Sequence, residues 1–167
     1  MFPAQLKLFH GSDGSFPMIK TILVPTDGSE HAEKAVALAA DFAKKYGAKL
    51  LLLHVMKELG SDRIPEGLRE YARAEHIEVT ERDILESVAR QIVRKAEVMA
   101  RDHEAPDIQS ALEFGDPAAS ILDSAAKSDA DLIVMGTRGL GNLQGMLLGS
   151  VSHKVCHLAD CSCVTVK

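Results

Sequence analysis

Five of the chain's twelve glycines lie in the seventeen-residue stretch MGTRGLGNLQGMLLGSV (135–151). The stretch begins at the end of the apolar segment DLIVM (131–135), whose composition predicts a buried strand. Glycine lets backbone N–H groups approach a ligand closely and can adopt positive φ angles. We therefore expect Gly136 and Gly139 to form a nest of amide donors that binds an anion.

A second anion-binding element is expected where this stretch ends. Gly149 and Ser150 begin a predicted helix, and the free amides and positive dipole end of a helix N-terminus favour negative charge. This effect contributes up to about 2 kcal/mol, whereas micromolar affinity needs about 8 kcal/mol. An apolar slot for a base is therefore also required, and the pattern favours a nucleotide over a lone phosphate. The residues expected to line the slot are Val24, Pro25, Val55 and Met135.

The loop PTDGS (25–29) follows another predicted strand. In doubly wound sheets, ligands bind beyond the carboxyl ends of strands where the strand order reverses. If the strands before the two loops are neighbours, the loops share one crevice. There Asp27 could accept hydrogen bonds from a ribose or help to hold a divalent ion. For Arg138, pairing with a phosphate and simple solvent exposure both remain open.

Two familiar phosphate-binding motifs do not fit the sequence. A Walker A loop needs a Gly-Lys-Ser/Thr ending, and no such lysine follows these glycines. A dinucleotide fingerprint needs a third glycine at the position of Gln144. On spacing alone, the glycine stretch could also be a flexible connection that allows tight packing of a helix against a strand.

Apolar and amphipathic segments alternate along the chain, which predicts an α/β fold with a parallel sheet and helices on both faces. Ser29 and Gly47 are expected to begin and end the first helix, and Asp116 and Pro117 to begin a later one that runs to Ala126. The expected strands are TILVP (21–25), AKLLLLHVM (48–56), DIQSALEFG (107–115), DLIVMG (131–136) and CSCVTVK (161–167).

Two segments need separate treatment. A straight helix over 66–101 would be about 54 Å long, so we expect a break near residues 76–80. Residues 1–17 are rich in Gly, Ser and Pro and are expected to be an extension outside the domain 18–167: a disordered tail, an early start codon or an expression remnant. The alternative is an arm that packs on a partner through Leu6, Leu8 and Phe9.

Composition narrows the function classes. The net charge of −5 and the lack of a basic cluster argue against nucleic-acid binding. No apolar run approaches the roughly 20 residues of a membrane helix, and no secretory signal pattern is present at the N-terminus. Three cysteines without framework spacing favour a reducing compartment. We therefore expect a cytoplasmic protein without membrane or nucleic-acid partners.

The sequence does not favour a metal site near the C-terminus. The residues concerned are His153, Cys156, His157, Cys161 and Cys163. The first three share one side of a helix, but the two strand cysteines do not form a Cys-x2-Cys knuckle. We expect buried cysteines that act as small hydrophobes and histidines at the surface. His54, at the end of a strand, is expected to be a rim residue with an ordinary hydrogen-bond partner.

With these motifs in place, the sequence resembles the universal stress protein family over residues 18–167. The family's ATP-binding pattern, Gly-x2-Gly-x9-Gly-Ser/Thr, fits Gly136, Gly139, Gly149 and Ser150. The segments MIKTILVPTDGSE, DLIVMGTRG and LLGSVSHKV resemble the opening strand and loop, the fourth strand and the last helix of the family. Two departures are the first seventeen residues and His153, where an acidic or polar residue is expected.

The resemblance implies a single-domain, Rossmann-like, adenine nucleotide alpha hydrolase-like fold with strand order 3-2-1-4-5. It implies ATP with Mg²⁺ or Mn²⁺, a homodimer through the last strand, and a role in stress response or in regulating a protein partner. The residues that would hold the adenosine part are Pro25, Thr26, Asp27 and Val55. Those that would hold ribose and phosphates are Met135, Gly136, Arg138, Gly139, Gly149, Ser150 and Val151.

Several alternatives stay open. AMP or cyclic AMP would use the same slot as ATP. Slow ATP hydrolysis or adenylyl transfer is an enzymatic alternative, although the sequence contains no His-x-Gly-His signature and no base to activate water beyond Asp27. A dimerisation module that binds no nucleotide is a further one. Independently of the family, the C-terminal VTV segment is expected to be an edge strand that a second copy could cover.

Overall fold

The computed structural model of the chain describes residues 19–57, 70, 81–140 and 148–167. Its five strands are β1 (Thr21–Pro25), β2 (Lys49–Met56), β3 (Asp107–Phe114), β4 (Leu132–Gly136) and β5 (Ser162–Val166). Its helices are α1 (Glu30–Tyr46), α3 (Glu81–Asp102), α4 (Pro117–Lys127) and α5 (Ser150–Leu158). The strands pair in parallel in the order β3-β2-β1-β4-β5, which confirms the expected fold.

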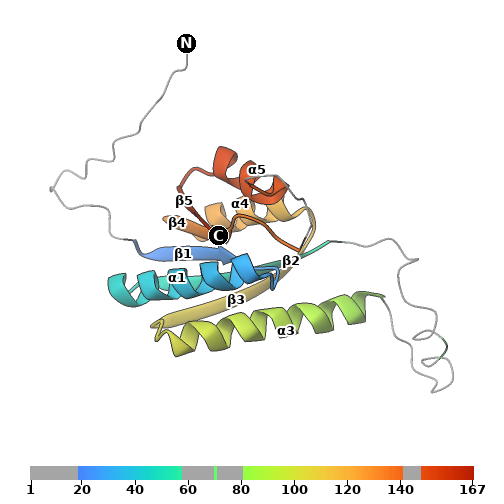
Figure 1. Cartoon of the computed structure of the whole chain (residues 1–167). Coiled ribbons are helices and arrows are strands. Elements are labelled where there is room, and N and C mark those ends of the chain that lie inside the picture. Colours follow the sequence, from blue (N-terminus) through green and yellow to red (C-terminus); the bar gives the residue numbers. More distant parts are fainter. Residues whose placement is uncertain (1–18, 58–69, 71–80, 141–147) are drawn as a thin grey trace, which may run out of the picture.

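The sheet lies between two helical layers (Figure 1). Helices α1 and α3 cover one face, where alanines of α1 pack on Leu50, Leu52 and Val134. Helices α4 and α5 cover the other face, where Ile121 and Val155 pack on alternate strand residues. Because the central strands are buried on both faces, their sequences are continuous apolar runs rather than alternating ones.

The helix ends lie where capping residues were expected. Ser29 caps α1 by accepting a hydrogen bond from the amide of Ala32 at 3.3 Å, and Gly47 ends α1 with φ +65°. Asp116 caps α4 by accepting from the amide of Ala119 at 3.0 Å. These contacts fix the N-termini of α1 and α4 next to the carboxyl ends of strands.

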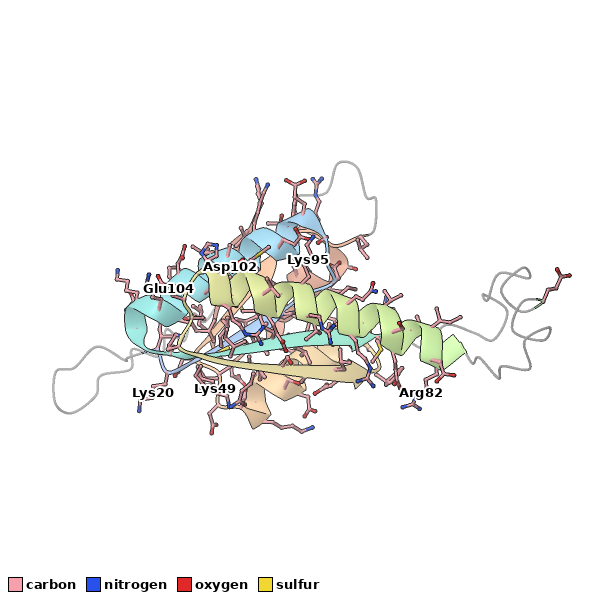
Figure 2. The ribbon with its side chains drawn as sticks, turned by 90° about the horizontal axis from the view of Figure 1, so that it is seen from below. Lys20, Lys49, Arg82, Lys95, Asp102 and Glu104 are labelled. Carbon is pink, nitrogen blue, oxygen red and sulfur yellow. The ribbon has the colours of Figure 1, made fainter. Side chains whose placement is uncertain are left out.

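Helix α3 runs antiparallel to the strands. Figure 2 looks onto the face covered by α1 and α3, with Lys20 and Lys49, at the amino ends of β1 and β2, toward the same end as Asp102. Arg82, in the first turn of α3, lies at the opposite end. An ion pair between Lys95 and Glu33, 2.5 Å long, joins α3 to α1.

Two expectations concern residues outside the described ranges. The break near residues 76–80 is one, although α3 begins directly afterwards at Glu81. The proposed extension 1–17 is the other. Among the residues that are described, no helix has the length and apolar composition needed to cross a membrane.

Candidate functional site

A cavity of about 440 Å³ lies at the carboxyl ends of β1, β2 and β4. Strands β1 and β4 are neighbours, so the loops that follow them meet at this point of the sheet. Every one of the eleven predicted site residues lines the cavity: Pro25, Thr26, Asp27, Val55, Met135, Gly136, Arg138, Gly139, Gly149, Ser150 and Val151. The wall also contains residues that the sequence did not single out for this site: Ala32, Leu53, Lys57, Pro117, Ile121, Leu140 and Ser152.

One side of the cavity is apolar. Leu53, Ile121 and Met135 are almost fully buried and line it together with Pro25 and Val55. The α4 contribution was missed, although the Asp116-Pro117 helix start signalled that α4 begins at this edge of the sheet. An apolar wall of this kind suits a flat aromatic ring.

The expectation that Val24 lines the slot was wrong. Its side chain is fully buried in the core beneath α1 and is not part of the cavity wall. Successive strand residues point to opposite faces. Pro25 lies at the cavity, so its neighbour in the strand faces the other layer.

Asp27 holds the two loops together. Its Oδ1 accepts a hydrogen bond from the amide of Ser29 at 3.0 Å, within the β1–α1 loop. Its Oδ2 accepts from the amide of Leu140 at 2.9 Å, in the loop after β4. The carboxylate therefore lies between the loops, at the wall of the cavity.

At Gly136 and Gly139 a side chain is disfavoured by close packing and not by a positive φ. Among described residues the positive-φ glycines are Gly28, Gly47 and Gly115, so that part of the nest prediction was wrong for Gly136 and Gly139. A Cβ on Gly136 would lie 2.9 Å from backbone atoms of α1. A Cβ on Gly139 would lie 2.2 Å from Oδ2 of Asp27.

The first turn of α5 supplies backbone donors. Gly149 is the N-cap, and the amides of Ser150, Val151 and Ser152 follow in the turn that has no earlier carbonyls to bond within the helix. The amide of Gly149 itself donates to the carbonyl of Thr137 at 2.7 Å, so it is not the free donor that was expected. The donors of this helix end therefore begin at Ser150.

Charged and titratable side chains lie at the rim. Arg138 lines the cavity and is exposed. His54 donates through Nδ1 to the carbonyl of Thr26 at 2.7 Å, which confirms a rim histidine with an ordinary partner. Lys57 adds a second cationic side chain to the wall.

The cysteines and histidines near the C-terminus lie outside the cavity wall. His153 and His157 are exposed, with rings stacked 6.4 Å apart, as expected of surface residues. Cys163 packs against the core beneath α4 and α5, and burial raises its pKa to about 12. Cys156 is exposed, so the prediction of a buried cysteine was wrong there. The described part of the chain contains no group of three or more His, Cys, Asp or Glu side chains able to hold a metal ion.

Comparison with known proteins places this geometry in context. The model of the universal stress protein family matches residues 18–167. A universal stress protein of Thermus aquaticus is 37% identical over 150 residues, covering 90% of this chain and all of that protein. Universal stress protein YxiE of Bacillus subtilis is 32% identical over 162 residues, with 90% and 100% covered.

Solved structures agree with this assignment. Universal stress protein UspA from Lactobacillus plantarum has a TM-score of 0.71 at 24% identity, covering 89% of this chain and 98% of that one, and supports the fold. A universal stress protein in complex with cAMP has a TM-score of 0.62 at 28% identity, covering 89% and 97%. Sequence motif, strand order and these likenesses coincide, and the chain belongs to the universal stress protein family.

Proposed function

We propose that the chain binds an adenine nucleotide, ATP foremost, in the cavity at the carboxyl ends of β1, β2 and β4. One observation carries this proposal: a single cavity joins an apolar wall to the N-terminus of α5. A relative of similar fold, 28% identical, has a structure with cAMP, which supports an adenine ligand for this chain as well.

The parts of the cavity divide the nucleotide between them. The base lies against Val55 and Met135, and Pro25 and Thr26 hold the adenosine part. Asp27 accepts from a ribose hydroxyl. The phosphates lie near Gly136 and Gly139 and at the first turn of α5, and hydrogen bonds to charged oxygens contribute about 1.5–3 kcal/mol each. Three such bonds together with the apolar wall reach the roughly 8 kcal/mol of micromolar affinity.

A divalent ion fits this arrangement only through the phosphates. Asp27 is the carboxylate among the described residues of the wall, and backbone amides occupy a lone pair on each of its oxygens. Mg²⁺ commonly keeps several waters and takes one or two carboxylates together with phosphate oxygens. We therefore propose that Mg²⁺ or Mn²⁺ arrives with ATP, with Asp27 as the protein group nearest to it.

Binding rather than turnover is the proposed activity. The carboxylate of Asp27 is engaged by the amides of Ser29 and Leu140, which disfavours it as a base that activates water.

We further propose that residues 18–167 form one cytoplasmic domain with 1–17 as an extension, and that the domain dimerises through β5. In this proposal nucleotide occupancy regulates a protein partner in the stress response.

Calorimetric titration of nucleotide-free protein with Mg-ATP, AMP, cyclic AMP and adenosine tests the binding proposal. We expect one site per chain, micromolar affinity for ATP, and weaker binding as phosphates are removed because fewer α5 and loop amides are used. Mg-GTP is the matched control for the base. Absence of heat with all the adenine ligands, or equal affinity for GTP, would overturn the proposal.

A further inference from the structure

We propose that Thr137 and His31 position the backbone amides proposed to bind phosphates, those of Gly139 and of the first turn of α5, although neither residue lines the cavity. This inference rests on the proposed function, because it concerns the affinity of the same site for phosphates. Thr137 directly follows β4, and its residue is only 4% exposed. Each of its polar groups has a partner on a different element.

The carbonyl of Thr137 joins the end of β4 to the start of α5. It accepts from the amide of Gly149 at 2.7 Å and from Oγ of Ser152 at 2.9 Å. Residues 137 and 149 are thereby joined by one hydrogen bond although twelve positions separate them. The N-terminus of α5 is consequently held at a fixed place relative to Thr137 and the end of β4.

The amide of Thr137 joins it to the edge strand β5, and its hydroxyl joins it to α1. Its amide donates to the carbonyl of Val166 in β5 at 2.8 Å. Its Oγ1 is hydrogen-bonded to Nδ1 of His31 at 2.9 Å. His31 belongs to the first turn of α1, whose backbone also packs directly against Gly136.

This network separates positioning from binding. The apolar wall, formed by β1, β2, β4 and α4, does not depend on the side chain of Thr137. Gly139 lies two residues after Thr137, and Ser150 directly follows Gly149, which is hydrogen-bonded to Thr137. The placement of the amides of Gly139 and Ser150 therefore does depend on Thr137. Loss of the hydrogen bond between Thr137 and His31 would loosen the position of Thr137. This loss should therefore weaken the binding of phosphates and leave adenosine binding unchanged.

The hydroxyl is tested by Thr137→Val, which removes Oγ1 with little change of shape, and by Thr137→Ser, which retains it. We expect Thr137→Val to weaken ATP binding about fivefold to tenfold, as for the loss of one buried hydrogen bond, while adenosine affinity stays within twofold. Thr137→Ser should restore ATP affinity. His31→Leu should weaken ATP binding to a similar extent. The double variant should have no lower ATP affinity than the single variant with the lower affinity, because both changes break the same bond.

Thr21→Val makes the same substitution at the other end of the sheet and is the matched control. Calorimetry with ATP and adenosine is combined with thermal unfolding of each variant. Unchanged ATP affinity in Thr137→Val, equal loss of ATP and adenosine, or additive losses in the double variant would each overturn the inference. If the wild-type protein binds neither ligand, the proposed function fails; if only the variant pattern is absent, the proposed function stands and this inference falls.

Discussion

Gly136 and Gly139 exclude side chains for different reasons. Gly136 faces backbone atoms of His31 and Ala32, which cannot move without shifting α1. Gly139 faces the carboxylate end of Asp27, which can rotate away. A methyl group at residue 136 therefore disturbs the packing of the fold, whereas one at residue 139 disturbs chiefly the contact between Asp27 and Leu140.

Gly139→Ala is predicted to weaken ATP binding about tenfold, which corresponds to about 1.4 kcal/mol, with little change in the unfolding midpoint. The added Cβ displaces Asp27 from the amide of Leu140. Calorimetry with ATP, beside thermal unfolding, measures both effects. In the Asp27→Ser variant, Gly139→Ala should reduce ATP affinity much less, since the added Cβ no longer meets a carboxylate. Equal costs in the two backgrounds would show that Gly139 acts independently of Asp27.

The cysteines are predicted to differ in reactivity. Cys156 is exposed, whereas burial raises the pKa of Cys163 to about 12, and the thiolate is the reactive form. At pH 8, iodoacetamide should therefore modify Cys156 well before Cys163, as followed by peptide mass spectrometry. In denaturant the two should react alike. Faster modification of Cys163 in the folded protein would contradict the structure.

For single residues, the sequence motifs and the family resemblance indicated which residues line the cavity, but not which residues they hydrogen-bond. All eleven residues that the family resemblance implied for the site line one cavity. The bond between Thr137 and His31 spans 106 positions and that between Leu140 and Asp27 spans 113, so no local pattern could indicate either. Positive φ was wrongly expected because glycine is also favoured where another segment packs closely, as the α1 backbone does at Gly136.

Three of the helices that begin at the carboxyl edge of the sheet contribute to the cavity wall: α1, α4 and α5. The starts of α1 and α4 were predictable, because Ser29 and Asp116 are strong N-cap residues. The start of α5 at Ser150 was also predicted from the end of the glycine-rich stretch, and the family motif agrees with it. Which face a strand residue takes was less predictable: a continuous apolar run carries no period of two, and Val24 was therefore assigned to the wrong layer.

The cap of α4 is predicted to make stability depend on acid pH. The hydrogen bond from the amide of Ala119 lowers the pKa of Asp116 below its ordinary value of 3.8. A lowered pKa in the folded state adds stability above the unfolded value, and this stability is lost as pH falls through the folded one. Asn keeps an acceptor at the cap but does not titrate.

The unfolding midpoint of Asp116→Asn, followed from pH 7 to about pH 3, should therefore fall less steeply than that of the wild-type protein. Asp160→Asn, an exposed change of the same charge in the turn before β5, is the control. If both variants follow the wild-type curve, the cap carboxylate does not contribute to the acid limb.

At the level of the whole molecule, the sheet formed by the described strands has β3 and β5 at its two edges. An uncovered edge offers unpaired backbone groups to another chain. We predict that β5 is the edge used in a homodimer, and that Thr165→Lys, at an exposed position of β5, shifts the protein toward monomer in sedimentation velocity. Gln109→Lys makes a comparable change on β3 and should leave the dimer intact. A monomeric wild-type protein, or dimer loss in both variants, would contradict this.

In the proposed complex, the base and the phosphates of one nucleotide occupy the two parts of a single cavity. Amide chemical shifts recorded while the labelled protein is titrated with Mg-ATP and, separately, adenosine test it most directly. Adenosine is expected to move the signals of Val55 and Met135, and ATP to move these and also those of Gly139, Ser150 and Val151. Shifts that lie away from this cavity, or identical shifts for the two ligands, would contradict it.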